Sequence, residues 1–237
     1  MTSQIVGSLL VVGAHCFDAE VMAGGLIKST TSLGYAAHIL HLSMGELGHK
    51  TMKPVEYAEQ KRTEALAAAQ ILNATVEFAE LPDAFVPSDD RSAMIVCKTI
   101  RSFRPSIVVT HTGGSWHKDH YAASQATMQG VFYAALPSVM PETTAHGVEK
   151  VLFAENWEDP GYPEPSVYYD ISDHIDSWRR AVLEYALGRG ELCDFRYFDY
   201  YHSLKCLRGC LVGRQYAEAY RSLDTPEMTG ICQFGKE

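Results

Sequence analysis

Long apolar runs and an excess of basic residues are both missing from this sequence of 237 residues. No stretch reaches the roughly 18 to 20 uninterrupted apolar residues that a membrane span needs, so we expect no membrane segment. The formal net charge is −9, which argues against nucleic acid or an anionic membrane surface as the main partner. A small molecule is therefore the expected partner.

A disulfide framework, linkers and repeats are missing as well. The six cysteines form no CxxC pair and no dense pattern, which is typical of reduced thiols in a cytosolic protein. The apolar opening, Ile5–Gly13, has no basic residues ahead of it, and removal of a signal peptide there would cut into the first polar cluster discussed below. We therefore predict a cytoplasmic protein with a single domain over residues 1–237.

Apolar segments of strand length alternate with helical patterns along most of the chain. Repeated strand–helix–strand units imply right-handed crossovers and a mainly parallel sheet. We therefore predict an α/β fold with helices on both faces of the sheet. The predicted strands are 5–14, 36–44, 76–81, 106–111, 151–155 and 167–171, and the predicted helices are 18–33, 54–72, 90–103, 119–135 and 173–187.

The region from about 173 to 223 differs from the rest because it is rich in aromatic residues. We predict that it is helical, with Tyr197, Phe198, Tyr200 and Tyr201 grouped in its second half. This is more aromatic surface than one helix usually exposes. A lid over a site, a subunit interface and a buried core face are the three interpretations.

Two polar clusters each follow a predicted strand. Residues 15–20 follow the first strand and residues 117–120 come shortly after the fourth, while the segment Gly45–His49 follows the second. In parallel sheets, ligands bind at the carboxyl ends of the strands. We therefore expect the three segments to meet at one site.

The two clusters contain the residue types of a catalytic metal site. His15, Asp18 and His120 supply two imidazoles and one carboxylate, which leave an open coordination position for water, as in catalytic zinc sites. His117 can stand beside that water, and Asp119 can orient an imidazole. Helix caps and solvent-facing histidines are the alternative for any single residue, but two such clusters at neighbouring strand ends favour a metal.

These residues resemble the PIG-L or LmbE-like N-deacetylase family. Residues 12–20, followed by Gly24-Gly25, are similar to the family's opening AHPDDxE motif, and residues 117–120 are similar to its HPDH motif. The resemblance covers most of the chain in the family's order. Weaker matches occur at Gly45–Gly48, Arg62–Glu64, Pro82-Asp83, Arg208-Gly209 and Tyr216–Ala219.

The resemblance implies a Rossmann-like three-layer fold and a zinc-dependent hydrolase, often a homo-oligomer. Its expected reaction is removal of an acetyl group from an N-acetylated amino sugar or a related conjugate. Each expected role rests on a match to a family motif. His15, Asp18 and His120 match the zinc ligands, His117 the general acid that stabilises the oxyanion, Asp119 its carboxylate support, and Arg62 and Asp83 positions that contact sugar hydroxyls.

Phe17 is the departure from the family pattern. It occupies the place of the aspartate that takes a proton from the metal-bound water, and a phenyl ring accepts no proton. A subset of the family also lacks this carboxylate, and the segment Asn156–Asp159 is similar to that subset. Zinc alone lowers the pKa of bound water to about 7, and a general base contributes roughly 100- to 10,000-fold.

Another carboxylate can replace the missing base. We expect Glu46 in that role because its loop adjoins the first cluster, with Glu20 and Asp119 as the next candidates. A relative that binds metal and sugar without catalysis is the main alternative function. A non-haem iron oxygenase shares the donor set of two histidines and one carboxylate, but the α/β alternation argues against it. A dinucleotide-binding dehydrogenase is disfavoured because the sequence lacks a GxGxxG turn after the first strand.

Overall fold

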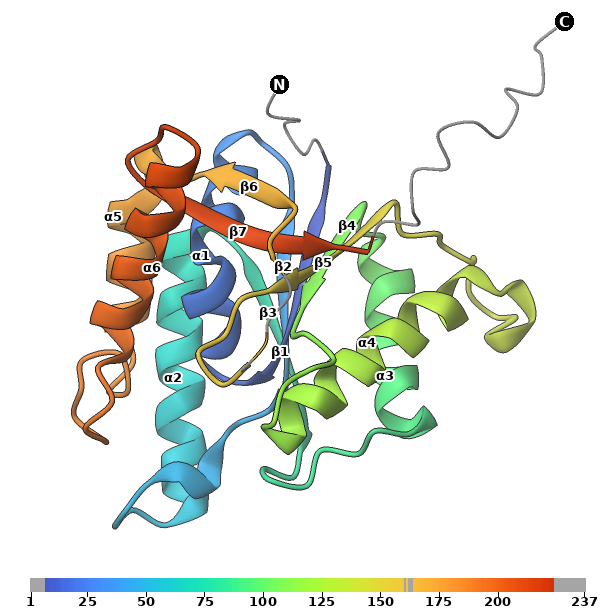
Figure 1. The fold of residues 1–237 in the computed structure, drawn as a ribbon. Helices are drawn as coiled ribbons and strands as arrows, with labels where there is room; N and C mark the ends of the chain where they lie inside the picture. Colours follow the sequence, from blue (N-terminus) through green and yellow to red (C-terminus); the bar gives the residue numbers. More distant parts are fainter. Residues whose placement is uncertain (1–6, 160, 162–163, 224–237) are drawn as a thin grey trace, which may run out of the picture.

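A computed structural model of the protein describes residues 7–159, 161 and 164–223 (Figure 1). Two positions of the first predicted strand, Ile5 and Val6, and the cysteine Cys232 lie outside the described residues. Within them, seven strands form one sheet in the order β3-β2-β1-β4-β5-β7-β6. The strands are β1 (Leu9–His15), β2 (Ala37–Ser43), β3 (Thr75–Leu81), β4 (Ile107–Thr110), β5 (Lys150–Ala154), β6 (Val167–Asp170) and β7 (Ala217–Ser222).

The sheet is mainly parallel, as predicted. The neighbours from β3 through β5 all pair in parallel, whereas β7 runs antiparallel to both β5 and β6. The topology places β1 in the interior of the sheet, between β2 and β4. The carboxyl ends of β1 and β4, which precede the two polar clusters, are therefore adjacent.

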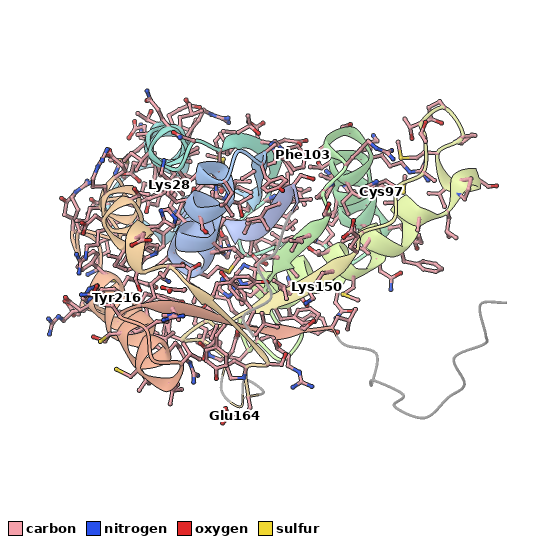
Figure 2. The ribbon with its side chains drawn as sticks, turned by 90° about the horizontal axis from the view of Figure 1, so that it is seen from above. Lys28, Cys97, Phe103, Lys150, Glu164 and Tyr216 are labelled. Carbon is pink, nitrogen blue, oxygen red and sulfur yellow. The ribbon has the colours of Figure 1, made fainter. Side chains whose placement is uncertain are left out.

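Helices cover both faces of the sheet, which confirms the three-layer α/β architecture (Figure 1). One face carries α1 (Asp18–Ser32), α2 (Pro54–Leu72), α5 (Ile175–Leu183) and α6 (Tyr197–Leu211), and the other carries α3 (Asp90–Phe103) and α4 (Lys118–Ala135). Lys28 of α1 and Cys97 of α3 accordingly lie on opposite sides in the view from above (Figure 2). Short 3₁₀ turns occur at Glu46–Gly48, Pro137–Val139 and Ser172–His174.

Side chains of β1 alternate between two apolar cores, as the geometry of a strand requires. Leu9 and Val11 pack in the core beneath α1, while Leu10, Val12 and Ala14 pack in the core beneath α3 and α4. The whole strand is buried. This explains the near-continuous apolar run from which the strand was predicted, because a central parallel strand is covered on both faces.

The C-terminal prediction needs a correction. The region predicted to be helical up to residue 223 leaves the helix at Leu211 and then forms β7. Gly213 has a φ of +67°, and a Cβ at Gly209 would lie 2.8 Å from the backbone of Arg214 and Gln215. Glycine at both positions therefore allows the chain to double back tightly after α6.

Strand β7 also fixes α1, the helix that begins at the site. The Glu218 carboxylate accepts hydrogen bonds from the backbone N–H groups of Gly25 (2.9 Å) and Leu26 (2.8 Å) within α1. The buried ammonium of Lys205 pairs with the same carboxylate at 3.1 Å and donates to the Val21 carbonyl. These contacts link α1 to the C-terminal third of the chain.

No helix among the described residues combines the length and apolar character needed to cross a membrane.

Candidate metal centre and active site

A sharp turn brings His15 and Asp18 to one point. His15 is the last residue of β1 and Asp18 the first of α1. Between them, Phe17 has a φ of +102°, which is uncommon for a bulky residue and costs on the order of 1–3 kcal/mol. The backbone N–H of His15 donates to Asp18 Oδ2 at 2.8 Å, which closes the turn.

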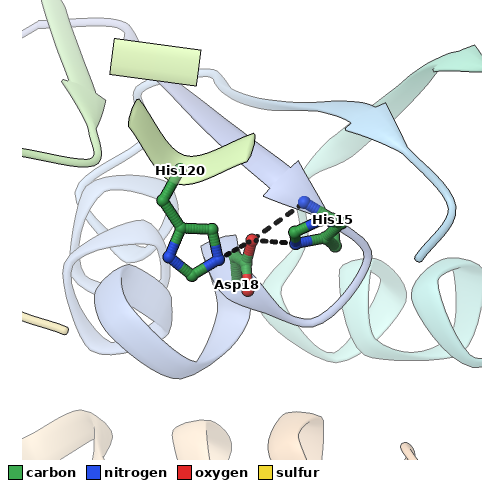
Figure 3. Close-up of side chains that lie close together, drawn as sticks. All are labelled: His15, Asp18 and His120. Atoms are coloured by element: carbon green, nitrogen blue, oxygen red, sulfur yellow. Dashed lines mark hydrogen bonds and ion pairs between the residues drawn. The ribbon is translucent and has the colours of Figure 1, made fainter. Parts of the chain in front are cut away.

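The structure brings together the three residues expected to bind metal (Figure 3). His15 Nδ1 lies 3.2 Å from Asp18 Oδ2, and His120 Nε2, on the first turn of α4, lies 3.5 Å from the same oxygen. Tetrahedral zinc with bonds of about 2.0–2.2 Å places its ligand atoms about 3.3 Å apart. The spacing of these nitrogen and oxygen atoms therefore fits a zinc ion.

The charge of the cluster also fits a divalent cation. His15 Nε2 faces Asp119 Oδ2 at 3.2 Å and Asp83 Oδ1 at 3.3 Å, while Asp18 lies at Nδ1. Burial by itself would lower the pKa of His15, but hydrogen bonds to these three carboxylates raise it well above its usual value. A metal ion is the usual means of balancing so many buried carboxylates.

Asp119 occupies a different place from the one expected. We predicted that it would support His117, but Oδ2 pairs with His15 and Oδ1 accepts the backbone N–H of Val86 at 3.2 Å. The carboxylate is fully buried. Because α4 begins at Lys118, the Asp119 side chain points from the first turn of that helix toward the end of β1. Asp119 therefore orients a candidate metal ligand.

His117 stands beside the candidate ligands, as predicted. Its ring stacks on the His120 ring at 4.3 Å and lies edge-on to the His15 ring at 5.1 Å. Nδ1 caps α4 by accepting the backbone N–H of Asp119. Burial, followed by the charge of His15, lowers the pKa of His117. The neutral ring then carries its proton on Nε2, where it is available as a hydrogen-bond donor.

A pocket of about 270 Å³ opens over these residues. His15, Asp18, His117 and His120 line its base together with Asp83. Burial by itself would raise the pKa of Asp83. Hydrogen bonds from His15, Leu47 and Ala84 outweigh this effect and lower the pKa to about 2. The walls are largely aromatic, and the rings that line them are Phe17, Tyr57, Trp157, Tyr197 and Tyr201.

Glu158 is a site residue that the sequence analysis did not select. It follows β5 and lines the pocket, and its Oε2 lies 3.2 Å from His120 Nδ1. Burial, with a smaller contribution from Asp18, raises the pKa of Glu158 to about 7. The sequence could have indicated Glu158, because it follows a predicted parallel strand and ligands bind beyond the carboxyl ends of such strands. However, β4 separates β5 from the strand that carries His15.

Glu46 does not reach this pocket, which corrects the prediction that it supplies the missing base. Oε1 accepts the backbone N–H of Asp83 at 3.2 Å, and Oε2 accepts from Ser43 Oγ at 3.4 Å. The 3₁₀ turn that begins at Glu46 thus uses this carboxylate to join two loops. Glu20 is also engaged elsewhere, because it accepts a hydrogen bond from Tyr185 and pairs with His41 at 3.3 Å.

Arg62 lies outside the pocket as well. Its guanidinium pairs with Glu80, and it stacks over the Phe78 ring at 4.6 Å. It lines a separate depression together with Glu46 and Glu59. The expectation that Arg62 contacts the substrate is therefore corrected, because its side chain packs against β3 and does not line the pocket.

His111 is a second residue that the sequence analysis missed. It directly follows β4, is fully buried and stacks on His120 at 4.1 Å. Its Nε2 accepts the backbone N–H of Ala14 at 3.0 Å and lies 3.3 Å from Asp18 Oδ2. His111 therefore fixes both the end of β1 and the His120 ring. The predicted strand 106–111 ended on this residue, so its position at a strand end could have identified it as a site residue.

Phe17 belongs to the aromatic packing above the site. Its ring lies edge-on to Tyr185 at 5.2 Å and to Tyr197 at 5.6 Å, and it is 2% exposed. The position that holds a carboxylate in the family motif is therefore part of the contact between α1 and the C-terminal region.

Comparisons with known proteins agree with this arrangement. Residues 10–131 match the model of the family described as PIG-L: GlcNAc-PI de-N-acetylase. A 4-oxalmesaconate hydratase of Pseudomonas putida is 28% identical over 85% of this chain and 80% of its own length. A 1D-myo-inositol 2-acetamido-2-deoxy-alpha-D-glucopyranoside deacetylase of Segniliparus rotundus is 24% identical, with 78% of this chain and 63% of that protein covered.

Solved structures of similar proteins share this fold. The crystal structure of GalB, the 4-carboxy-2-hydroxymuconate hydratase of Pseudomonas putida KT2440, superposes with a TM-score of 0.82 at 26% identity, covering 92% of this chain and 96% of that one. The family model spans both polar clusters and more than half of the chain. The chain belongs to the PIG-L family, which includes deacetylases and has a hydratase among its relatives.

Proposed function

We propose that this protein is a zinc-dependent hydrolase that removes an acetyl group from the amine of an N-acetylated amino sugar or a related conjugate. The observation that carries the proposal is the convergence of His15, Asp18 and His120 at the base of a small pocket, with His117 beside them. Membership of a family that includes deacetylases supports it. The size and aromatic walls of the pocket suit a small ring-shaped ligand.

His15, Asp18 and His120 would hold the zinc ion. When bound there, zinc polarises the acetyl carbonyl and lowers the pKa of water to about 7. Asp119 hydrogen-bonds the distal nitrogen of His15, and Glu158 Oε2 lies 3.2 Å from the distal nitrogen of His120, which Asn156 also contacts. Such second contacts fix the orientation of the imidazoles and strengthen them as ligands.

Glu158 is proposed as the base that replaces the missing aspartate. Oε2 faces His120, and no hydrogen bond to Oε1 occurs within the part of the chain that the structure describes. Oε1 can therefore take a proton from water as the oxygen attacks the acetyl carbon. Glu158 then passes this proton to the amide nitrogen as the C–N bond breaks, and the products are the free amine and acetic acid, which ionises to acetate.

His117 is proposed to stabilise the negative charge that develops on the carbonyl oxygen. Its Nδ1 accepts the backbone N–H of Asp119, so a neutral ring presents the N–H of Nε2 as a donor. A donor that is already oriented toward an oxyanion contributes roughly 100- to 1,000-fold to kcat.

Acetate release from N-acetylglucosamine, its disaccharide, simple N-acetyl glycosides and N-acetylated substrates that carry a carboxylate tests the proposal, with zinc-loaded and metal-stripped protein compared side by side. Zinc-dependent release is expected. If the natural chain releases no acetate but its Phe17→Asp variant does, the protein is instead a metal- and sugar-binding relative without catalysis. No acetate release from any substrate by either the natural chain or the variant would reject the deacetylase.

Addition of water to a carbon–carbon double bond is the second candidate function. Two observations favour it: Phe17 replaces the family's base, and the relatives that align over most of both chains include a hydratase. The residues proposed for deacetylation can also perform this reaction. Glu158 or His117 can exchange a proton with the carbon next to a polarised carbonyl. Loss of the ultraviolet absorbance of a conjugated unsaturated oxo acid measures this reaction directly.

A further inference from the structure

Lys61 presents a buried positive charge to the pocket. It belongs to α2, is 4% exposed and lines the pocket together with the candidate metal ligands. Its ammonium donates to the Cys16 carbonyl at 3.0 Å and lies 5.4 Å from the centre of the Tyr57 ring. A Cβ at Gly45, whose φ is +73°, would lie 2.6 Å from Nζ, so glycine at this position leaves room for the ammonium.

No carboxylate lies within ion-pair distance of Lys61 in the described part of the chain. Glu64, one turn further along α2, instead accepts hydrogen bonds from Gln60 and from the backbone of Ala186. Asp83 is used by His15 and by the backbone of Leu47. Lys61 therefore keeps donors that the protein itself does not use.

A buried ammonium without an anion is costly, because burial removes water and no opposite charge replaces it. Lysine is almost never fully buried unless it is paired. Lys205, which is also buried, follows this rule, since it pairs with Glu218. Lys61 departs from this rule and lies in the pocket, so a bound ligand can supply the negative charge that the protein does not.

We propose that Lys61 forms a carboxylate-binding subsite next to the metal centre, and that the substrate carries a carboxylate at this position. This inference rests on the proposed function and specifies its substrate class. A single ammonium with two available donors matches one negative charge, whereas phosphate usually needs several donors or an arginine fork. The Asp83 and Glu158 carboxylates that line the same pocket also disfavour a dianion.

Binding of benzoate and benzamide to the zinc-loaded protein tests the proposal without assuming the reaction. The two probes share one ring and differ in the negative charge. In Lys61→Gln, which keeps a donor for the Cys16 carbonyl, we expect benzoate affinity measured by calorimetry to fall roughly 10- to 100-fold. Benzamide affinity should stay unchanged. Lys118→Gln is the matched control, because Lys118 is an exposed lysine beside His117, and it should alter neither affinity.

Lys61→Arg separates loss of charge from loss of folding, since it keeps the positive charge and should retain most of the preference for benzoate over Lys61→Gln. An equal change for both probes in Lys61→Gln, or no measurable binding of benzoate to the natural chain, would overturn the carboxylate subsite. Acetate release is a separate readout. Selective loss of benzoate binding without any acetate release would leave the subsite standing and reject the deacetylase.

Discussion

The two ligand loops, residues 15–18 and 117–120, and the facing aromatic wall, Trp157, Tyr197 and Tyr201, line one pocket but are constructed differently. The ligand loops follow buried parallel strands, and their polar side chains contact one another within 3.5 Å. The aromatic wall comes from the loop after β5 and from α6, and its members touch through ring packing and one weak hydrogen bond. We therefore expect the first region to carry most of the chemistry and the second to select the substrate.

Removing a candidate metal ligand tests the first region and should have the largest effect. In Asp18→Ala, we expect bound zinc to disappear and activity to fall to the level of metal-stripped protein, because both histidines lose the carboxylate that they share. Elemental analysis and turnover measure the two quantities. The exposed Asp173 provides the control Asp173→Ala, which should keep both. Full zinc binding by Asp18→Ala would contradict the assignment.

Glu158 connects the two regions, since it lies in the wall segment but faces His120. In Glu158→Gln, we expect kcat to fall roughly 100- to 10,000-fold. Zinc affinity should persist, because glutamine can still accept a hydrogen bond from His120 Nδ1. In Glu46→Gln, the matched control, kcat should stay within about twofold because that carboxylate lies outside the pocket.

A reversed result for these two variants would restore Glu46 as the base. A loss of zinc affinity of roughly 10- to 100-fold in Glu158→Gln would reduce Glu158 to a residue that only orients His120.

Phe17 is a member of the ligand loops that packs with the C-terminal aromatic rings. In Phe17→Ala, we expect the free energy of unfolding to fall by about 3–5 kcal/mol, because the buried ring leaves a cavity between Tyr185 and Tyr197. Urea denaturation measures the change. The exposed Phe132 offers the comparison Phe132→Ala, expected within about 0.5 kcal/mol. Equal losses in the two variants would show that Phe17 is not a core residue.

The aromatic wall itself should give the smallest effect. In Tyr197→Leu, we expect KM to rise roughly 3- to 10-fold with kcat nearly unchanged, because the ring contact with the substrate is lost, while the hydroxyl that is also removed is not among the groups proposed to transfer protons. Steady-state kinetics distinguish the two parameters. Tyr200 lines a separate depression and is not among the residues that line the pocket, so Tyr200→Leu should change neither. A fall in kcat with constant KM in Tyr197→Leu would place this tyrosine in the chemistry.

The difference between the regions also explains what could be predicted from the sequence. Apolar runs of strand length marked β1 and β4, and parallel topology placed their ends together, so the convergence of His15, Asp18 and His120 followed from local patterns. Helices 54–72 and 90–103 were predicted to the residue. Such segments carry their own signals of periodicity and capping, which do not depend on distant contacts.

Contacts between distant segments could not be predicted in this way. Glu158 reaches His120 across the β4–β5 pair, and Asp119 turns toward His15 rather than His117. Strand β7 was mistaken for helix because its register depends on β5 and β6, which lie far away in sequence. The direction of a side chain in a loop is set by tertiary contacts, as the positions of Glu46 and Arg62 show.

Zinc titration of the metal-stripped natural chain, with bound zinc and acetate release followed together, is the sharpest test of the proposed zinc-dependent deacetylase. We predict that activity toward N-acetyl substrates rises in proportion to bound zinc and reaches its maximum at one ion per chain, as one site formed by His15, Asp18 and His120 requires. Acetate release that is independent of zinc would contradict a metal-dependent deacetylase, and so would one tightly bound ion per chain with no release from any N-acetyl substrate.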